Sequence, residues 1–367
     1  MNQPDFAARL LQWFDRHGRH DLPWQHPREP YRVWLAEIML QQTQVATVIP
    51  FFTRFLARFP DLRTLAQAPA DDVLAHWAGL GYYARARNLH RCAQLIVERH
   101  HGEFPREIER LSELPGIGRS TAAAVLAQAF GQRHAILDGN VRRVLARHAA
   151  IAGWPGQPAV QKKLWPLSER LLPRQRLADY TQAIMDLGAT VCTSRKPACG
   201  ICPLRDDCAA RLQGAVLDYP GAKPRRAHPQ KRAWMLIIEN LLGEIFCERR
   251  PPAGIWGGLW CLPMLQEEQD WQQLCLQRYG LRCGAPSPLA AVRHSFTHFD
   301  LEILPLRLRA ESSAFEIRES EGRRWIKMAP GNPPVGLPAP VRKLLESPNL
   351  SLDQLQCPEL STASSSA

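Results

Sequence analysis

Four cysteines lie close together in one short stretch of the chain, Cys192, Cys199, Cys202 and Cys208, with the spacing C-x6-C-x2-C-x5-C. Thiolates at such a spacing can hold a [4Fe–4S] cluster. A structural zinc ion with four cysteine ligands is the alternative. Zinc sites more often use two C-x2-C pairs, and this stretch has one such pair. The spacing therefore predicts a metal centre, and the single pair weighs towards the cluster.

One carboxylate, Glu37, lies within the mostly apolar stretch YRVWLAEIMLQQ. On a helix its neighbours would be Val33 and Trp34 on one side and Leu40 on the other. A carboxylate in such surroundings loses water and its pKa rises, which suits a general acid near neutral pH. The alternative is a surface glutamate on an amphipathic helix, but these neighbours leave little polar face. We therefore interpret Glu37 as a candidate acid.

The stretch LPGIGRSTAAAVLAQAFGQRHAILDGN, residues 114–140, combines a glycine-containing turn with a second carboxylate. Gly116 and Gly118 permit backbone angles that a side chain would forbid, and they bare the first amides of the next helix. Such amides suit a phosphate oxygen. Asp138 then precedes a basic helix. An ordinary connection between helices, with Asp138 as an N-cap, is the alternative.

The overall composition is basic, with a formal net charge of +11 over 367 residues, which points to a polyanionic partner. No run of about 18 apolar residues exists, so no membrane span is predicted. The N-terminus has no signal-peptide core, and Phe6, Leu10 and Phe14 have the spacing of a packing helix. Clustered cysteines favour a metal site over disulfides in a cytosolic chain. We therefore expect a soluble, basic, cytoplasmic protein.

Periodicity and composition divide the chain into four segments. The first has the pattern of helices joined by short turns, the second is a basic Pro-rich linker, the third alternates like strands, and the fourth is a Ser-rich tail expected to be disordered. These segments are residues 1–213, 214–232, 233–346 and 347–367. Within the third, strands are expected at 233–239, 244–248 and 301–308 and a helix at 267–279. An all-α domain followed by an α+β domain is predicted.

Several stretches occur together in one order: AEIMLQQT, GLGYYARARNL, LPGIGRSTAAA, LDGNVRR and the cysteine loop of residues 192–208. The combination resembles the MutY-type adenine DNA glycosylases of the helix-hairpin-helix superfamily over nearly the whole chain. The resemblance implies an all-α helix-hairpin-helix glycosylase domain with a [4Fe–4S] loop, followed by an α+β Nudix-like domain. The first would comprise a six-helix barrel and a cluster subdomain built from both ends of the catalytic region, with DNA bound across the cleft between them.

The resemblance also implies roles for individual residues. Glu37 would protonate the adenine of a flipped nucleotide and later help to activate water, while Asp138 would stay ionised and stabilise the cationic sugar. Ser120 and Asn140 would be hydrogen-bonding neighbours of these two acids. The residues expected to contact DNA or the adenine are Gln41, Gln42, Tyr82, Gly116, Gly118 and Gln182. The implied cofactor is one [4Fe–4S] cluster, held by the four cysteines.

The endonuclease III type shares the helical core and the cluster, and it is the alternative assignment, a glycosylase and lyase acting on oxidised pyrimidines. Its nucleophilic lysine lies where this chain has Ser120. A serine cannot form the Schiff base that lyase chemistry needs. The resemblance therefore implies a monofunctional glycosylase of base excision repair, which removes adenine opposite 8-oxoguanine or guanine and leaves an abasic site.

The C-terminal segment resembles a Nudix fold that has lost its metal-binding carboxylates. Gln273, Leu274, Gln277 and Arg278 stand at the corresponding places, so nucleotide hydrolysis is not expected there. The family uses this domain to recognise 8-oxoguanine, and the matching segment is Phe296, Thr297 and His298. The expected partner is duplex DNA holding an A:8-oxoguanine or A:G mispair, bound by a monomer in the bacterial cytoplasm, at the nucleoid.

Overall fold

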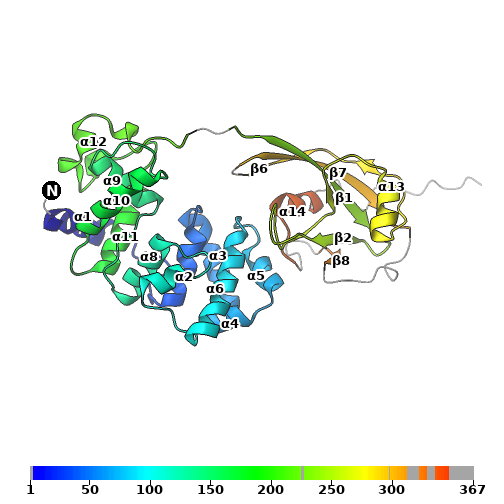
Figure 1. The fold of residues 1–367 in the computed structure, drawn as a ribbon, viewed down its shortest axis with the longest axis horizontal. Helices are drawn as coiled ribbons and strands as arrows, with labels where there is room; N and C mark the ends of the chain where they lie inside the picture. The colour runs from blue at the N-terminus through cyan, green and yellow to red at the C-terminus, as the bar shows by residue number, and fades with distance from the viewer. Residues whose placement is uncertain (1–2, 225–226, 297, 312–321, 329–334, 347–367) are drawn as a thin grey trace, which may run out of the picture. The chain divides into compact units, whose positions relative to one another are not determined.

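The computed structural model describes residues 3–224, 227–296, 298–311, 322–328 and 335–346. The chain divides into two compact units, Met1–Ala227 and His228–Ala367, which are considered separately below. The first unit is helical and the second is built on a sheet (Figure 1), so the prediction of an all-α domain followed by an α+β domain is confirmed. No helix of the described ranges is long and apolar enough to cross a membrane.

The first helix of the helical unit packs against helices from the C-terminal part of the same unit. Helix α1 (Gln3–His17) buries Phe6, Leu10 and Phe14, as their spacing predicted. These side chains share one core with residues of α9, α10 and α11. The helices of this unit are α2 (Pro30–Leu40), α3 (Val45–Arg58), α4 (Leu62–Gln67), α5 (Ala70–Trp77), α6 (Ala84–His100), α7 (Ile108–Ser112), α8 (Arg119–Phe130), α9 (Gly139–His148), α10 (Pro158–Leu171), α11 (Leu177–Asp186) and α12 (Ala209–Leu212).

Helices α2 and α8 form the centre of this unit and pack against each other. Helix α2 starts at Pro30, whose fixed φ suits the first helical turn, and it buries residues on nearly all sides. Helix α8 is Ala-rich, and every residue from Ala122 to Gln128 is buried. Small side chains let neighbouring helices approach closely. The packing therefore brings Gln128 of α8 to Glu37 of α2 inside the unit.

The second unit is a mixed sheet flanked by short helices. Strands β1 (Gln230–Glu239) and β7 (Asp300–Arg309) pair in parallel over their full lengths. Strand β2 (Glu244–Arg249) pairs with β1 in the hairpin that the sequence predicted. The sheet order is β3-β2-β1-β7-β5, with β4, β6 and β8 paired to β1, β7 and β2. These shorter strands are Trp260–Cys261, Met264–Leu265, Ser287–Pro288, Val292–Ser295 and Arg323–Lys327 for β3, β4, β5, β6 and β8, and α14 spans Ala339–Leu345.

The helix expected at 267–279 begins later, at Trp271. Helix α13 (Trp271–Leu274) continues as a π-helical stretch to Tyr279. The Asp270 carboxylate accepts the backbone amide of Gln273 at 3.1 Å, which fixes the start of the helix. The side chain of Trp271 is buried in the core between this helix and the sheet.

Much of the expected linker, residues 214–232, is ordered by the two units. Arg147 donates to the carbonyl oxygens of Val216 at 3.0 Å and Tyr219 at 2.8 Å. At the other end, β1 already starts at Gln230. The linker bounds stay a prediction, and the basic and proline-rich composition did not reveal that a buried arginine binds the start of this segment.

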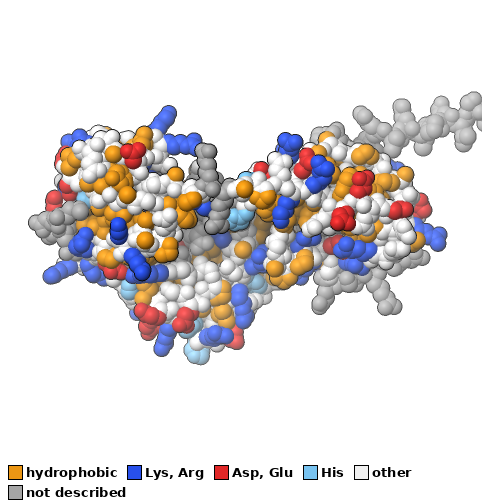
Figure 2. Space-filling model, turned by 45° about the horizontal axis from the view of Figure 1, so that its top comes forward, with side chains coloured by type: hydrophobic (Ala, Val, Ile, Leu, Met, Phe, Trp, Pro, Cys, Tyr) orange, Lys and Arg blue, Asp and Glu red, His pale blue; other side chains and the backbone are white. Residues whose placement is uncertain are grey.

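Outside the cysteine loop, five cysteines are buried: Cys92, Cys247, Cys261, Cys275 and Cys283. Cys357 and the predicted disordered tail lie outside the described residues. Lys and Arg side chains are spread over the visible face of each unit (Figure 2), in keeping with the basic composition.

Candidate active site

The side chain of Glu37 retains a little exposure to solvent but is enclosed by protein atoms. Desolvation by burial is the largest cause that raises its pKa, to about 7, and the charge of Asp138 raises it further. The Gln128 amide donates to Glu37 Oε1 at 3.1 Å and acts in the opposite direction. The pKa rise predicted from the apolar neighbours in sequence is therefore present in the structure.

Asp138 is the N-cap of helix α9. Its Oδ1 accepts the backbone amide of Val141 at 2.8 Å, and its Oδ2 accepts the side-chain amide of Asn140 at 3.3 Å. Burial is the largest effect and raises the pKa of Asp138 overall, while the backbone amides of Val141 and Asn140 and the nearby guanidinium groups of Arg143 and Arg142 act in the opposite direction. Asp138 thus has many more groups that favour its charged form than Glu37 has.

Leu137, the residue before Asp138, makes side-chain hydrogen bonds through both its backbone amide and its backbone carbonyl. The Leu137 amide donates to the Ser120 hydroxyl at 2.9 Å, and the Leu137 carbonyl accepts from Arg142 Nε at 2.9 Å. Ser120 lies in the first turn of α8, so its hydroxyl ties that helix to the segment that carries Asp138. Ser120 therefore positions Asp138 through its backbone neighbour.

Asn140 is supported from the side of the cysteine loop. Arg143 donates to Asn140 Oδ1 at 2.8 Å, to the Gly188 carbonyl at 2.7 Å and to the Cys192 carbonyl at 2.7 Å. One guanidinium group therefore joins the amide that contacts Asp138 to the first cysteine of the loop.

The turn before α8 includes the two glycines that were expected to bare amides. Gly116 has φ +79°, and a Cβ there would lie 3.0 Å from Asn88 Cβ, so both the conformation and the close approach favour glycine. Gly118 differs from the expectation. Its φ of −91° is available to any residue, and a Cβ there would meet nothing within 4 Å. Backbone strain therefore does not explain glycine at position 118, which stands beside open space.

Gln41, Gln42 and Tyr82 lie on two turns of the helical unit. Gln42 and Tyr82 both adopt a left-handed backbone, with φ +58° and +50°, and both are exposed, Tyr82 by 47%. Such angles are strained for residues other than glycine and occur often at functional sites. The Gln41 side chain donates to the Gly116 carbonyl at 3.4 Å, so the first turn contacts the glycine turn.

Gln182 of α11 is buried, and its amide is fixed. Its Nε2 donates to Asp186 Oδ1 at 2.7 Å. Asp186 also accepts from the backbone amide, Nε and Nη2 of Arg19, at 2.8, 3.0 and 2.6 Å. This bond fixes the orientation of the amide, whose carbonyl oxygen is the atom that can accept a hydrogen bond from a ligand.

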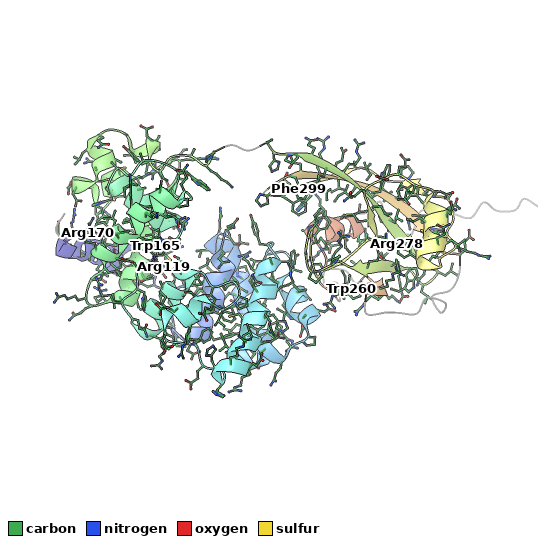
Figure 3. The ribbon with its side chains drawn as sticks, viewed as in Figure 1. Arg119, Trp165, Arg170, Trp260, Arg278 and Phe299 are labelled. Atoms are coloured by element: carbon green, nitrogen blue, oxygen red, sulfur yellow. The ribbon has the colours of Figure 1, made fainter. Side chains whose placement is uncertain are left out.

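Several residues that contact the site residues, or lie beside them, were not predicted from the sequence: Arg19, Arg85, Arg119, Gln128 and Asp186. Most of their contacts join segments tens of residues apart, and no local pattern marks them. Arg119 stands next to the glycine turn, and its guanidinium lies 3.9 Å from the centre of the Trp165 ring (Figure 3). It also pairs with Glu169 at 2.6 Å. A lone arginine at the start of a helix gives no sign of either partner.

The four cysteines line one hollow that is partly open to solvent. Apolar side chains such as Val144, Leu187 and Leu204 form much of its wall. Arg147 donates to Cys192 Sγ at 3.3 Å and to the carbonyls of the next two residues. Four sulfur ligands around one hollow, with a guanidinium donor beside them, fit an iron–sulfur cluster.

A site for one metal ion would need at least three ligand side chains close together. Within the described ranges, no three His, Cys, Asp or Glu side chains are arranged to hold one metal ion. A hollow shared by four thiol groups is the arrangement that a polynuclear group requires. When bound, a cluster would join the segments of this loop, and its thiolate ligands would lie beside the positively charged Arg147.

In the second unit, Phe296 belongs to an aromatic group at the turn between β6 and β7. Its ring stacks on that of Phe299, which Figure 3 labels, with 4.6 Å between the ring centres, and the centre of the Trp256 ring lies 5.6 Å away. His298 is exposed, and Thr297 lies outside the described residues. The positions that replace the Nudix carboxylates, Gln273, Leu274, Gln277 and Arg278, lie on the helical stretch from Trp271 to Tyr279.

Gly188, in the π-helical turn Leu187–Val191, tests how tightly Asn140 is held. A Cβ at position 188 would lie 2.6 Å from Asn140 Cβ. Alanine in place of helical glycine ordinarily stabilises a protein by up to about 1 kcal/mol. Here overpacking should reverse the sign, so we expect Gly188→Ala to lower the unfolding free energy of the helical unit by about 1–3 kcal/mol, measured by urea denaturation. Gly322→Ala, beside open space, is the control. Unchanged or higher stability for Gly188→Ala would contradict the close contact.

Models of known protein families match residues in both the helical unit and the second unit. The family model of the HhH-GPD superfamily of base excision DNA repair proteins matches residues 35–170. The iron–sulfur binding domain of endonuclease III matches residues 192–208, and the NUDIX domain matches residues 233–347. Among solved structures, a thermostable thymine-DNA glycosylase is 28% identical with a TM-score of 0.51, over 57% of this chain and 97% of its own.

Curated relatives match over both units. The adenine DNA glycosylase of Buchnera aphidicola (subsp. Acyrthosiphon pisum) is 36% identical over 343 residues, covering 93% of this chain and 97% of the relative. The human adenine DNA glycosylase is 34% identical, covering 88% of this chain and 70% of the relative. Identity at this level over nearly the whole length settles the assignment: the chain belongs to the adenine DNA glycosylase family, as a base excision repair enzyme that acts on DNA and carries an iron–sulfur binding domain and a Nudix-like domain.

Proposed function

We propose that this enzyme hydrolyses the N-glycosidic bond of adenine mispaired with 8-oxoguanine or guanine and leaves the DNA strand intact. The observation that carries the proposal is the unequal environment of its two carboxylates. Glu37 has one side-chain donor and a pKa of about 7, whereas Asp138 has several donors and two nearby arginines. Carboxylates in environments that favour opposite protonation states are the usual pair for breaking a glycosidic bond.

In this mechanism the adenine first leaves the helix and enters the enzyme. Protonated Glu37 gives its proton to N7 of the base, the bond between C1′ and N9 breaks, and the electron pair leaves with adenine. Ionised Asp138 stabilises the cationic sugar that remains. Glu37, now a carboxylate, accepts a proton from water as the water oxygen bonds to C1′. The Gln182 carbonyl oxygen would accept a hydrogen bond from the adenine amino group.

The strand should stay uncut because the site offers no amine nucleophile where the lyases have lysine. The Ser120 hydroxyl accepts the Leu137 amide and cannot form a Schiff base. The intact strand with an abasic site is then the product.

The cluster is proposed to be [4Fe–4S], held by Cys192, Cys199, Cys202 and Cys208. The four cysteines line one hollow beside the Arg147 guanidinium group, and within the described residues no three His, Cys, Asp or Glu side chains are arranged to hold a single ion, which supports a polynuclear group over one zinc ion. Its proposed role is structural, since the loop that it would hold carries Arg195, Lys196 and Arg205 for contact with DNA.

The second unit is proposed to recognise 8-oxoguanine through Phe296, Thr297 and His298. The aromatic ring of Phe296 can stack on a base, and the exposed His298 and the Thr297 hydroxyl can hydrogen-bond to one. Glutamine, leucine and arginine in place of the Nudix carboxylates leave no ligand set for magnesium, which supports recognition without hydrolysis.

Replacing Glu37 with glutamine should slow catalysis and, at pH 8, increase the free energy of unfolding. Glu37→Gln should slow adenine release by about 10²–10⁴-fold in single-turnover assays, because the proton donor is lost. Because the folded pKa is raised, stability due to Glu37 is present below about pH 4 and is lost as the pH rises through 7. Glu37→Gln avoids that loss, so at pH 8 it should be more stable than the parent by at most about 3 kcal/mol, and by little near pH 4. Exposed Glu98→Gln is the control. Near-normal turnover of Glu37→Gln would refute the assignment.

The substrate and the product are tested with a duplex holding one adenine opposite 8-oxoguanine. We expect strand cleavage only after alkaline treatment, because base removal leaves an abasic site that alkali breaks. Equal cleavage without alkali would indicate lyase activity. Duplexes with guanine or thymine opposite the adenine give the order of preference, and Phe296→Ala with His298→Ala should reduce the advantage of 8-oxoguanine over guanine. Equal losses on both substrates would contradict the proposed role of that segment.

A further inference from the structure

Arg85 of α6 is a buried arginine, 8% exposed, that contacts two turns distant in sequence. Its Nη1 donates to the carbonyl oxygens of Ile38 at 3.0 Å, Met39 at 2.6 Å and Gln41 at 2.7 Å. The Ile38 and Met39 carbonyls lie in the last turn of α2, where the helix dipole is negative, and Gln41 is the residue that follows the helix. The guanidinium group therefore caps α2 and holds the turn that follows.

The same guanidinium group holds the second turn with its other nitrogen. Arg85 Nη2 donates to the Leu80 carbonyl at 3.3 Å, the Gly81 carbonyl at 3.2 Å and the Thr43 hydroxyl at 3.1 Å. The Trp77 indole also donates to the Gly81 carbonyl, at 3.1 Å. One side chain thus joins residues 38–43 to residues 80–81.

Each of these turns carries an exposed residue with a left-handed backbone, which is strained for a residue other than glycine. Gln42 has φ +58° and Tyr82 has φ +50°. The Arg85 guanidinium carbon lies 5.4 Å from the centre of the Tyr82 ring, within the range of a cation–π contact. Left-handed angles in non-glycine residues persist only when surrounding contacts fix them. The hydrogen bonds of Arg85 are such contacts for both turns.

We propose that Arg85 is a positioning residue that joins the turns of residues 41–43 and 79–82 into one rigid wedge, so that Gln42 and Tyr82 enter the DNA duplex together. The inference deepens the proposed function, since it depends on these turns probing the duplex beside the mispaired adenine. Wedge residues that move together share the cost of unstacking one base step, whereas independent turns could each fold away from the DNA.

The chemistry of the guanidinium group explains why lysine could not serve here. Burial lowers the pKa of Arg85 to about 10, so the group stays charged at neutral pH. Its planar fork reaches acceptors on two sides at once, whereas an ammonium group is a single point. Arg85→Lys therefore keeps the charge and removes the bridge.

The test compares Arg85→Lys in the parent enzyme and in the Gln42→Ala/Tyr82→Ala variant. In the parent we expect single-turnover adenine release to fall about 10–100-fold, because misplacement of site residues has effects of this size. In the Gln42→Ala/Tyr82→Ala background the same change should cost less than about threefold, since there is no wedge left to position. Fluorescence of a 2-aminopurine next to the mispair should fall with the rate in the parent, because it reports unstacking by the wedge.

Arg133→Lys is the matched control. Arg133 also caps a helix, α10, by donating to the carbonyls of Glu169 at 3.3 Å and Leu172 at 3.1 Å, but it touches neither turn. Its replacement should leave adenine release within about twofold. If Arg85→Lys folds poorly by circular dichroism, Thr43→Val removes one acceptor of the bridge and should give a smaller effect with the same dependence on background.

Equal losses in the two backgrounds would overturn the proposal, because a purely structural role of Arg85 adds independently to the loss of the wedge. The proposal also fails if Gln42→Ala/Tyr82→Ala releases adenine at the parent rate. Failure of the proposed function itself looks different: the unmodified enzyme would then release no adenine from an A:8-oxoguanine duplex.

Discussion

Two carboxyl groups share one poorly hydrated region of the helical unit, and they cannot both carry a charge there without cost. The charge of Asp138 raises the pKa of Glu37, and burial acts on both. The surrounding hydrogen bonds decide which group ionises first. Donors gather at Asp138, from the first turn of α9 and from Asn140, while Glu37 receives one amide. The distribution of donors thus favours the charged form of Asp138 more than that of Glu37.

Arginines, rather than further carboxylates, maintain this arrangement. Arg142 and Arg143 fix the backbone and the amide beside Asp138, Arg19 fixes the carboxylate that orients Gln182, and Arg147 fixes the cysteine loop. Each bridges acceptors from separate segments, which a planar guanidinium group can do and an ammonium group cannot. A basic composition therefore has two uses in this chain. Exposed cations suit a polyanion, and buried guanidinium groups hold the site together internally.

The sequence predicted those features whose cause is local. The apolar neighbours of Glu37 predicted the direction of its pKa shift, the spacing of Phe6, Leu10 and Phe14 predicted the packing of α1, and the spacing of the four cysteines predicted the cysteine loop. Features caused by distant contacts could not be predicted this way. Arg85 reads as one basic residue among several, yet its acceptors lie more than 40 residues earlier. The contacts at the start of the expected linker have the same cause, since Arg147 donates to the Val216 carbonyl from 69 residues away.

Strain and burial at this site both oppose stability, and the reason lies in the chemistry. A desolvated glutamate with a pKa of about 7 and two left-handed non-glycine residues would each be selected against in a protein that only had to fold. They persist because capped helices and bridged turns over-determine the local structure. Rigid support is what allows an acid to be kept protonated at neutral pH while exposed turns project at fixed angles. The packing of α2 against α8 therefore stabilises the unit enough to offset the stability that is lost at Glu37, Gln42 and Tyr82.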